Sequence, residues 1–281
     1  MRKRKSQAVA HIWLVIMVLI YVVPIWLMIV TSFRSPVGGV FRDWSPFKIQ
    51  AFVPYSPDFS GYTSLFAAGS VFRQALVNTL IVCAVTVVVG TIVNLLAGFA
   101  FAYFDFKGKN VLFTISLITF AVPFEAIVIP TLSIMQNLSL VDTLAAVILP
   151  TIASGFLVFM FRQFYRGIPH DLREAAMIDG ASLFSIMWHI YLPLSRPLIV
   201  TSSIVLFIAQ WQALFLPLAV LRSQSNWVLQ LALASLQGTI QLPSWGPVLA
   251  GGVITLLIPL VLVAPFMRHF RLSLLDGSTR G

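Results

Sequence analysis

The stretch IPHDLREAAMIDGASLFSIMWHIYLP, from Ile168 to Pro193, is the longest moderately polar segment of a chain that is otherwise mostly apolar. Pro169 suits the first turn of a helix because its φ angle is already helical. Asp171 and Glu174 have the Asp-x-x-Glu spacing of a capping box, which satisfies free backbone N–H groups where a helix starts. The segment, called the elbow below, is therefore predicted to begin with a helix.

The elbow is predicted to bend at Gly180, because a residue without Cβ adopts the left-handed angles that end a helix at little cost. A second helix should run from Ser182 to Tyr191 and stop before Pro193. The first helix places four residues on one face, at i, i+3, i+4 and i+7: Leu172, Ala175, Ala176 and Asp179. Its two alanines make this face flat, so a groove in a partner protein can accept it closely. A short amphipathic helix that lies on a bilayer explains the pattern equally well.

The composition of the chain indicates a membrane protein. Of its 281 residues, 59% are hydrophobic and only 10% are charged, which is too apolar for one soluble core. The formal net charge of +9 would suggest nucleic acid as the partner of a soluble protein. Here the basic residues lie at the ends of apolar runs, where they indicate topology. The chain is expected to contact membrane lipid, and nucleic acid is not an expected partner.

The apolar runs divide the chain into six predicted spans. A basic cytoplasmic tail at 1–11 precedes a first transmembrane helix at 12–33, whose apolar run is too long for a signal peptide. A proline-rich outer loop follows at 34–72. A five-helix core at 73–267 contains a cytoplasmic loop at 162–196, and a cytoplasmic tail occupies 268–281. The core spans are predicted at 74–104, 111–135, 143–161, 197–221 and 245–267.

The distribution of charge predicts the orientation of these spans. In this arrangement thirteen of the 18 lysines and arginines lie inside and five outside. Because basic residues concentrate on the cytoplasmic side, both termini are predicted to be cytoplasmic. The predicted fold class is an all-α integral membrane protein with six transmembrane helices. Residues 223–244 are too polar to span, and they form either an outer loop or a partly re-entrant segment.

Glu125 is the acidic residue that the sequence places within the bilayer, between Pro123 and Pro130. Burying a carboxylate in hydrocarbon costs on the order of several kcal/mol unless the carboxylate faces water or a partner. Glu125 is therefore a candidate for the wall of a translocation pathway. A position near the outer interface, or a pairing with another helix, explains it at least as well.

A second candidate for the pathway is the trio Gln210-Trp211-Gln212 at the end of the fifth predicted span. An aromatic face and amide groups suit the hydroxylated ring of a sugar. The favoured alternative is an interfacial belt with satisfied amides, because tryptophan is common where a span meets water.

The elbow resembles a loop of a known protein family. It contains Glu174-Ala175-Ala176 and then Asp179-Gly180-Ala181, and the run Leu192-Pro193-Leu194-Ser195-x-Pro197 extends past its end. These residues look like the cytoplasmic EAA loop of the permease subunits of binding-protein-dependent ABC importers. Weaker matches resemble the carbohydrate-uptake branch, with its maltose-type inner-membrane permeases: Tyr62, Asn78-Thr79-Leu80, Trp245-Gly246 and Gly277-x-x-Arg280-Gly281. Gln212 and Arg280 stand where that branch usually has Asn and Lys, which weakens any transfer of substrate.

The resemblance implies a type I ABC importer permease fold in a bacterial cytoplasmic (inner) membrane. In the family, the loop holds a coupling helix that sits in a cleft of the cytoplasmic ATPase. The implied coupling residues are Leu172, Glu174, Ala175, Ala176, Asp179, Gly180 and Ala181. The implied partners are two ABC ATPase subunits, a second homologous permease and an extracytoplasmic solute-binding protein.

The chain is not expected to be an enzyme. It lacks the Gly-x-x-x-x-Gly-Lys-Ser/Thr phosphate loop, so ATP and Mg are expected on the partner ATPase, and this chain is expected to bind no cofactor or metal. A membrane enzyme is disfavoured because the sequence has no His-Glu-x-x-His and no Gly-x-Ser-x-Gly.

The expected function is a permease subunit that forms half of the translocation pathway for a carbohydrate or a related small solute. A permease for a polyol or for glycerol phosphate is the alternative. A secondary transporter is less favoured, since it would normally have more spans and several buried ionisable groups.

Overall fold

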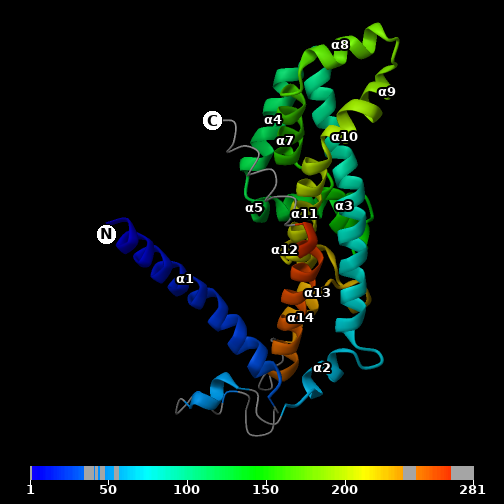
Figure 1. Cartoon of the computed structure of the whole chain (residues 1–281). Helices are drawn as coiled ribbons and strands as arrows, with labels where there is room; N and C mark the ends of the chain where they lie inside the picture. The colour runs from blue at the N-terminus through cyan, green and yellow to red at the C-terminus, as the bar shows by residue number, and fades with distance from the viewer. Residues whose placement is uncertain are drawn as a thin grey trace. The chain divides into compact units, whose positions relative to one another are not determined.

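The computed structural model describes residues 2–34, 41, 44, 48–53, 57–236 and 245–266, and its regular elements are all helical (Figure 1). The chain forms two compact units. One unit comprises residues 1–73 and 232–260, and the other comprises 74–231 and 261–281. The two units are described separately below.

The described residues contain four helices that are long and apolar enough to cross a membrane, at 10–32, 71–103, 144–166 and 245–266. Two further helix pairs pass the same test together but are bent, by 110° between 109–121 and 124–137 and by 73° between 183–194 and 196–211. The number of spans reaches six if each bent pair counts as one. The predicted all-α membrane fold is confirmed, while the count of six spans and the orientation of the termini remain predictions.

The first unit contains α1 (Arg2–Ser32), η1 (Ile49–Phe52) and α2 (Ser60–Leu65). The indole of Trp26 in α1 donates to the Phe52 carbonyl at 3.0 Å, so η1 is fixed against α1. The segment predicted as an outer loop, 34–72, contains both η1 and α2. The helix α2 forms after the prolines, where the Asp58 carboxylate accepts from the Ser60 N–H at 2.7 Å.

The sixth predicted span corresponds to α14 (Trp245–Val263) followed by η5 (Ala264–Phe266). Its first turn lies against α2 with no room for a side chain between them. A Cβ added at Gly61 would lie 2.8 Å from the backbone of Gly246, so glycine is required for this approach. The segment before it, 237–244, lies outside the described residues.

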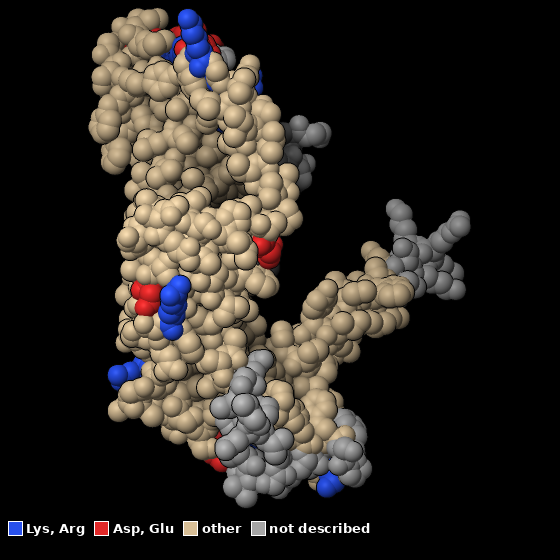
Figure 2. All heavy atoms as spheres, turned by 180° about the vertical axis from the view of Figure 1, so that it is seen from behind, with Lys and Arg blue, Asp and Glu red and all other residues tan. Residues whose placement is uncertain are grey.

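The second unit is built around α3 (Val71–Tyr103) from its residue Gln74 onward, with α4 (Lys109–Ala121), α7 (Gly155–Arg166) and α11 (Arg196–Trp211). Small residues permit close contact between these helices. A Cβ at Gly98 would lie 2.4 Å from Cβ of Phe161, and one at Gly155 would lie 1.8 Å from the Ser116 carbonyl oxygen. Charged side chains are sparse on the face in Figure 2, as expected for a surface in contact with lipid.

The third predicted span, 111–135, is wrong as a single straight helix. It is broken into α4 and α5 (Phe124–Asn137) with a 110° bend. Proline disfavours helical angles in the residue before it, and Val122 is extended, with φ −81° and ψ 124°. Pro123 then caps α5.

The fourth predicted span, 143–161, differs from the structure at both its middle and its end. It consists of α6 (Leu144–Ile148), the 3-10 turn η2 (Leu149–Thr151) and α7, which continues to Arg166. The helix extends past Arg162 because the guanidinium lies 3.9 Å from the centroid of the Phe113 ring, where the aromatic face accommodates the charge. The loop predicted at 162–196 therefore begins after Arg166.

The break between η2 and α7 is held by Asn94 of α3, which is fully buried. Its Nδ2 donates to the Ile152 carbonyl at 2.8 Å, and its Oδ1 accepts from the Ser154 N–H at 2.8 Å. Backbone groups at membrane depth need partners within the protein, since lipid offers none. Asn94 therefore makes an irregular backbone stable in this part of the fold.

The end of the second unit that carries Asp142 is a network of loop hydrogen bonds. The Asp142 carboxylate accepts from the Arg222 and Ser223 N–H groups, each at 2.9 Å, and from the Ser223 hydroxyl. These hydrogen bonds, led by that of the Ser223 side chain, hold the pKa of the Asp142 carboxyl well below its usual range. They fix the loop between α12 (Phe215–Val220) and η4 (Gln224–Asn226).

The polar segment predicted at 223–244 is packed onto α3 where the structure describes it. Asn78 Nδ2 donates to the carbonyls of Ser225 and Trp227, at 2.8 and 2.9 Å, and the Thr79 hydroxyl accepts from the Leu229 N–H at 2.7 Å. The helix α13 (Leu229–Ser235) begins at that point.

Candidate functional site

The first limb of the elbow is α8 (His170–Ile178), which runs at a steep angle to α3 and α7 (Figure 1). Pro169 is the N-cap, and no side chain completes the cap. The predicted capping box is therefore wrong, because the helix begins before Asp171 and places it in the first turn. A carboxylate there still interacts favourably with the helix dipole.

The bend after α8 occurs at Gly180, as predicted. Gly180 has φ +76°, and a Cβ there would have nothing within 4 Å. The Ala181 N–H donates to the Ala176 carbonyl at 2.9 Å, and the Gly180 N–H donates to the Met177 carbonyl at 3.1 Å. This left-handed cap satisfies the last carbonyls of α8 and reverses the chain.

The second limb of the elbow continues further than the sequence predicts. It comprises α9 (Leu183–Ile186), the π-helix η3 (Met187–Tyr191) and α10 (Leu192–Leu194), and it ends at Ser195. Stopping before Pro193 is wrong, because the π-turn changes the hydrogen-bond register and proline falls in the first turn of α10. The chain then bends by 73° into α11.

The elbow stands on a compact aromatic base. The Tyr191 ring of the second limb lies 5.0 Å from Phe99 of α3 and 5.4 Å from Tyr165 of α7, measured between centroids. The Tyr165 hydroxyl donates to the buried Ser195 hydroxyl at 3.4 Å. Edge-to-face aromatic contacts of this kind add about 0.5–1.5 kcal/mol each beyond the apolar area they bury. The base therefore holds both ends of the elbow to the two long helices.

The tip of the elbow exposes large apolar side chains. Ile178 is 86% exposed and Phe184 is 74% exposed, and Phe184 stacks on Trp188 with 6.0 Å between ring centroids. Glu174 and Asp179 are also exposed. Exposed apolar groups rimmed by charge are typical of a surface that binds a protein or a membrane.

The seven predicted coupling residues divide into two sets. Leu172, Glu174, Ala175, Asp179 and Gly180 are exposed on the elbow, whereas Ala176 and Ala181 are half-buried and pack against the aromatic base. The predicted flat face is therefore split, because the base covers one of its two alanines. The structure brings all seven residues into one bend of the chain but leaves only five of them accessible to a partner.

The predicted pathway residues do not form one site. Glu125 is exposed in the first turn of α5, directly after the 110° bend. Gln210 is buried, and its Nε2 donates to the Thr86 hydroxyl at 3.4 Å and to the Thr151 hydroxyl. The amide therefore joins α11 to α3 and η2, and it is used in packing the unit.

Trp211 is buried as well, 5.6 Å from the Phe207 ring, and its carbonyl accepts from Gln230 Nε2 at 3.1 Å. Gln212 alone of the trio is exposed. The described residues contain no group of three His, Cys, Asp or Glu side chains that could hold a metal ion.

Sequence reasoning missed the side chains that hold the fold at its irregular points. Asn94 lies within a charge-free predicted span, and a polar side chain inside such a run was the available signal. Its partners lie 58 and 60 residues away, so spacing could not identify them.

Comparisons with known proteins define the class of protein that carries this elbow. Residues 90–270 match the family model described as binding-protein-dependent transport system inner membrane component. The chain is 31% identical to the arabinooligosaccharides transport system permease protein AraQ of Bacillus subtilis, over 94% of this chain and 92% of the relative. It is 30% identical to the sn-glycerol-3-phosphate transport system permease protein UgpE of Yersinia pestis, over 98% of both chains.

A solved structure shares the fold. A chain of a bacterial ABC transporter involved in the import of the acidic polysaccharide alginate aligns with a TM-score of 0.82 and 22% identity, covering 95% of this chain and 96% of that one. The described residues form several apolar helices, and the chain matches inner-membrane permeases. It is therefore a multi-pass protein of the inner membrane. The chain belongs to the family of inner-membrane components of binding-protein-dependent transport systems, the permeases of ABC importers, which form transport channels rather than catalysts.

Proposed function

We propose that this chain forms half of the translocation pathway of an ATP-driven importer and that the elbow couples it to the ATPase. The observation that carries the proposal is the tip of the elbow, where Ile178 and Phe184 are exposed beside Glu174 and Asp179. A water-exposed apolar tip is favourable only if a partner covers it. The alternative reading, a helix lying on the bilayer, accounts less well for acidic residues at the tip, because the inner leaflet carries negative charge.

The orientation that this function requires is six spans with both termini in the cytoplasm. The elbow then faces the cytoplasm, where two ATPase subunits bind ATP and Mg. The opposite side faces a solute-binding protein, and a second homologous permease completes the pathway. Lipid surrounds the spans, and nucleic acid has no part. The excess of lysine and arginine on the proposed cytoplasmic side supports this orientation.

Transmission of force follows from the packing of the elbow. When ATP binding closes the ATPase pair, the two docked elbows are drawn together. The aromatic base of Phe99, Tyr165 and Tyr191 passes this displacement to α3 and α7 as a rigid movement, since a packed interior resists compression. The central cavity then opens toward the binding protein. The accessible coupling residues Leu172, Glu174, Ala175, Asp179 and Gly180 contact the ATPase, and Ala176 and Ala181 seat the elbow on its base.

The substrate class is a carbohydrate or a related small solute. Relatives named for arabinooligosaccharides and for lactose support a sugar, at 31% and 34% identity. A relative named for sn-glycerol-3-phosphate supports the alternative, at 30% identity. Membership of a binding-protein-dependent family favours an importer over a secondary transporter.

Co-purification of the ATPase with the full transporter tests the coupling role. Ile178→Ser removes an apolar side chain that is 86% exposed, and Ile49→Ser is the matched control because Ile49 is 81% exposed in the predicted outer loop. We expect Ile178→Ser and Glu174→Lys to release the ATPase and Ile49→Ser to retain it. Retention of a fully active ATPase by both elbow variants would refute the proposal.

A further inference from the structure

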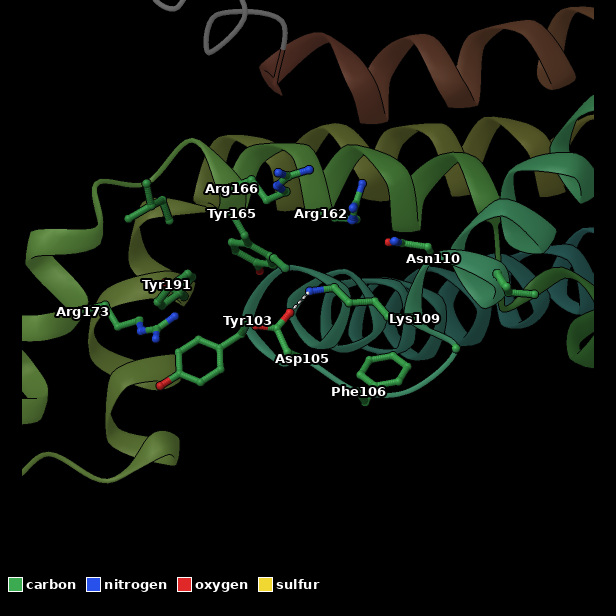
Figure 3. Close-up of a pocket in the computed structure, with 14 residues that line it drawn as sticks. Tyr103, Asp105, Phe106, Lys109, Asn110, Arg162, Tyr165, Arg166, Arg173 and Tyr191 are labelled. Carbon is green, nitrogen blue, oxygen red and sulfur yellow. Dashed lines mark hydrogen bonds and ion pairs between the residues drawn. The ribbon is translucent and has the colours of Figure 1, made fainter.

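A pocket of about 720 Å³ lies between the α3–α4 turn, the end of α7 and the elbow (Figure 3). Four basic side chains line it, from Lys109, Arg162, Arg166 and Arg173. Asp105 is the one carboxylate in the lining, and it pairs with Lys109 at 3.1 Å between Oδ1 and Nζ. The three arginines therefore share the pocket with no counter-ion among the described residues.

The positions of the three arginines are unfavourable in the absence of an anion. The Arg173 guanidinium lies 4.7 Å from the centroid of the Tyr103 ring, and its Nε is buried without a hydrogen-bond partner among the described residues. A buried donor left without a partner destabilises the folded state. Like charges held in one pocket also repel each other. A group with a negative charge relieves this repulsion, and its oxygens can accept from the guanidinium N–H groups that line the pocket.

The pocket lies where three apolar helices end. The helix α3 ends at Tyr103, α4 begins at Lys109 and α7 ends at Arg166. The ends of apolar spans lie at the depth of the lipid phosphate groups, and basic pockets between spans are typical sites for anionic headgroups. Directly along α4 from the pocket, apolar side chains are exposed for contact with acyl chains: Val111, Leu112 and Ile115.

We propose that this pocket binds a phosphate group, supplied by the headgroup of an anionic phospholipid whose acyl chains lie along α4. Arg162 and Arg166 bind it from α7, and Arg173, which lies beside Tyr103 and Tyr191 in Figure 3, adds positive charge from α8. A bound headgroup therefore attracts the charged residue Arg173 of the elbow toward the helical bundle, and this attraction depends on lipid composition. The site requires only the geometry of the pocket, so it stands whether or not the elbow couples to an ATPase.

The test uses the full transporter in nanodiscs of phosphatidylcholine alone or with phosphatidylglycerol, and native mass spectrometry counts the retained lipid. We expect phosphatidylglycerol to be retained selectively. Each arginine near a bilayer contributes about 1 kcal/mol toward an anionic headgroup, so Arg166→Gln and Arg173→Gln should each weaken retention about fivefold. Arg196→Gln is the matched control, because Arg196 is exposed in the same part of the chain and does not line the pocket.

Each result supports or overturns the proposal. Equal loss of phosphatidylglycerol in Arg166→Gln and Arg196→Gln would mean diffuse attraction to a charged surface and would overturn it, as would equal retention of the two lipids. Inorganic phosphate that displaces phosphatidylglycerol from the wild type, and not from Arg166→Gln, would support the pocket with soluble phosphate as the source. Loss of the ATPase without any change in lipid retention would assign the arginines to a partner's carboxylates and overturn it. Rescue by Arg166→Lys, which restores the charge, separates a defect in binding from a defect in folding.

Discussion

Replacing Gly180 with valine tests whether the bend of the elbow matters for coupling. Gly180 has φ +76° and nothing within 4 Å of an added Cβ, so the substitution introduces backbone strain without a clash. An L-residue in the left-handed region costs about 1–2 kcal/mol, and more when it is β-branched. The strain lowers the population of the native bend about fivefold to thirtyfold.

Gly69 supplies a matched control for this strain. It has φ +78° and, like Gly180, nothing within 4 Å of an added Cβ, but it lies between α2 and α3 rather than in the elbow. The two valine variants should therefore lose similar stability. We expect only Gly180→Val to weaken the affinity of the transporter for its ATPase, by about the same fivefold to thirtyfold. Gly180→Asn should be close to the wild type, because asparagine tolerates the left-handed region.

The assay is titration of purified ATPase onto the permease assembly in nanodiscs, followed by the rate of ATP hydrolysis that substrate-loaded binding protein stimulates. Both valine variants are first shown to be intact by gel filtration and by their unfolding midpoints. Equal ATPase affinity in Gly180→Val and Gly69→Val would refute the reasoning, because the strain is matched and only its location differs.

Three further predictions follow from the structure. Asn94→Ala leaves two backbone groups unpaired at membrane depth and should lower the free energy of unfolding by about 2–5 kcal/mol, whereas the exposed Asn137→Ala should change it little; equal unfolding curves in mixed micelles would contradict this. Asp142 has a pKa lowered by hydrogen bonds, so its contribution to stability is present above about pH 4 and is lost as pH falls further; Asp142→Asn should be less stable at neutral pH, with the difference shrinking in acid. A difference that is independent of pH would count against that explanation. Glu125→Gln should slow transport or change its selectivity if Glu125 lines the pathway, and unchanged uptake in proteoliposomes would remove it from the pathway.

The sequence predicted the bend of the elbow from neighbouring residues, although the capping box and the helix stop before Pro193, which are equally local, were wrong. The left-handed bend at Gly180 follows from a glycine after an alanine-rich helix, and the structure has it. Gly98 of α3 lies against Phe161 of α7, and its small size permits this contact, but the sequence alone does not identify α7 as the partner. The bend at Gly180 needed only local geometry.

The bent and broken helices were beyond such reasoning. The apolar character of 111–135 predicts one span there, and it cannot show that the chain turns by 110° between α4 and α5. Proline disfavours a helix before it but does not dictate the direction in which the chain continues. The direction depends on packing with distant segments, as α5 shows by packing against α12.

The same limit applies to the two limbs of the elbow, and it bears on how the elbow works. The π-turn before Pro193 lets the second limb continue to Ser195, where the hydroxyl accepts from Tyr165. The chain therefore leaves the elbow at Ser195, which is hydrogen-bonded to Tyr165 of α7, and not at a free hinge. The break before α7 is likewise held by Asn94 of α3. Because both irregular points are fixed to long helices, a force at the tip moves α3 and α7 together with the elbow, whereas a free hinge would absorb it.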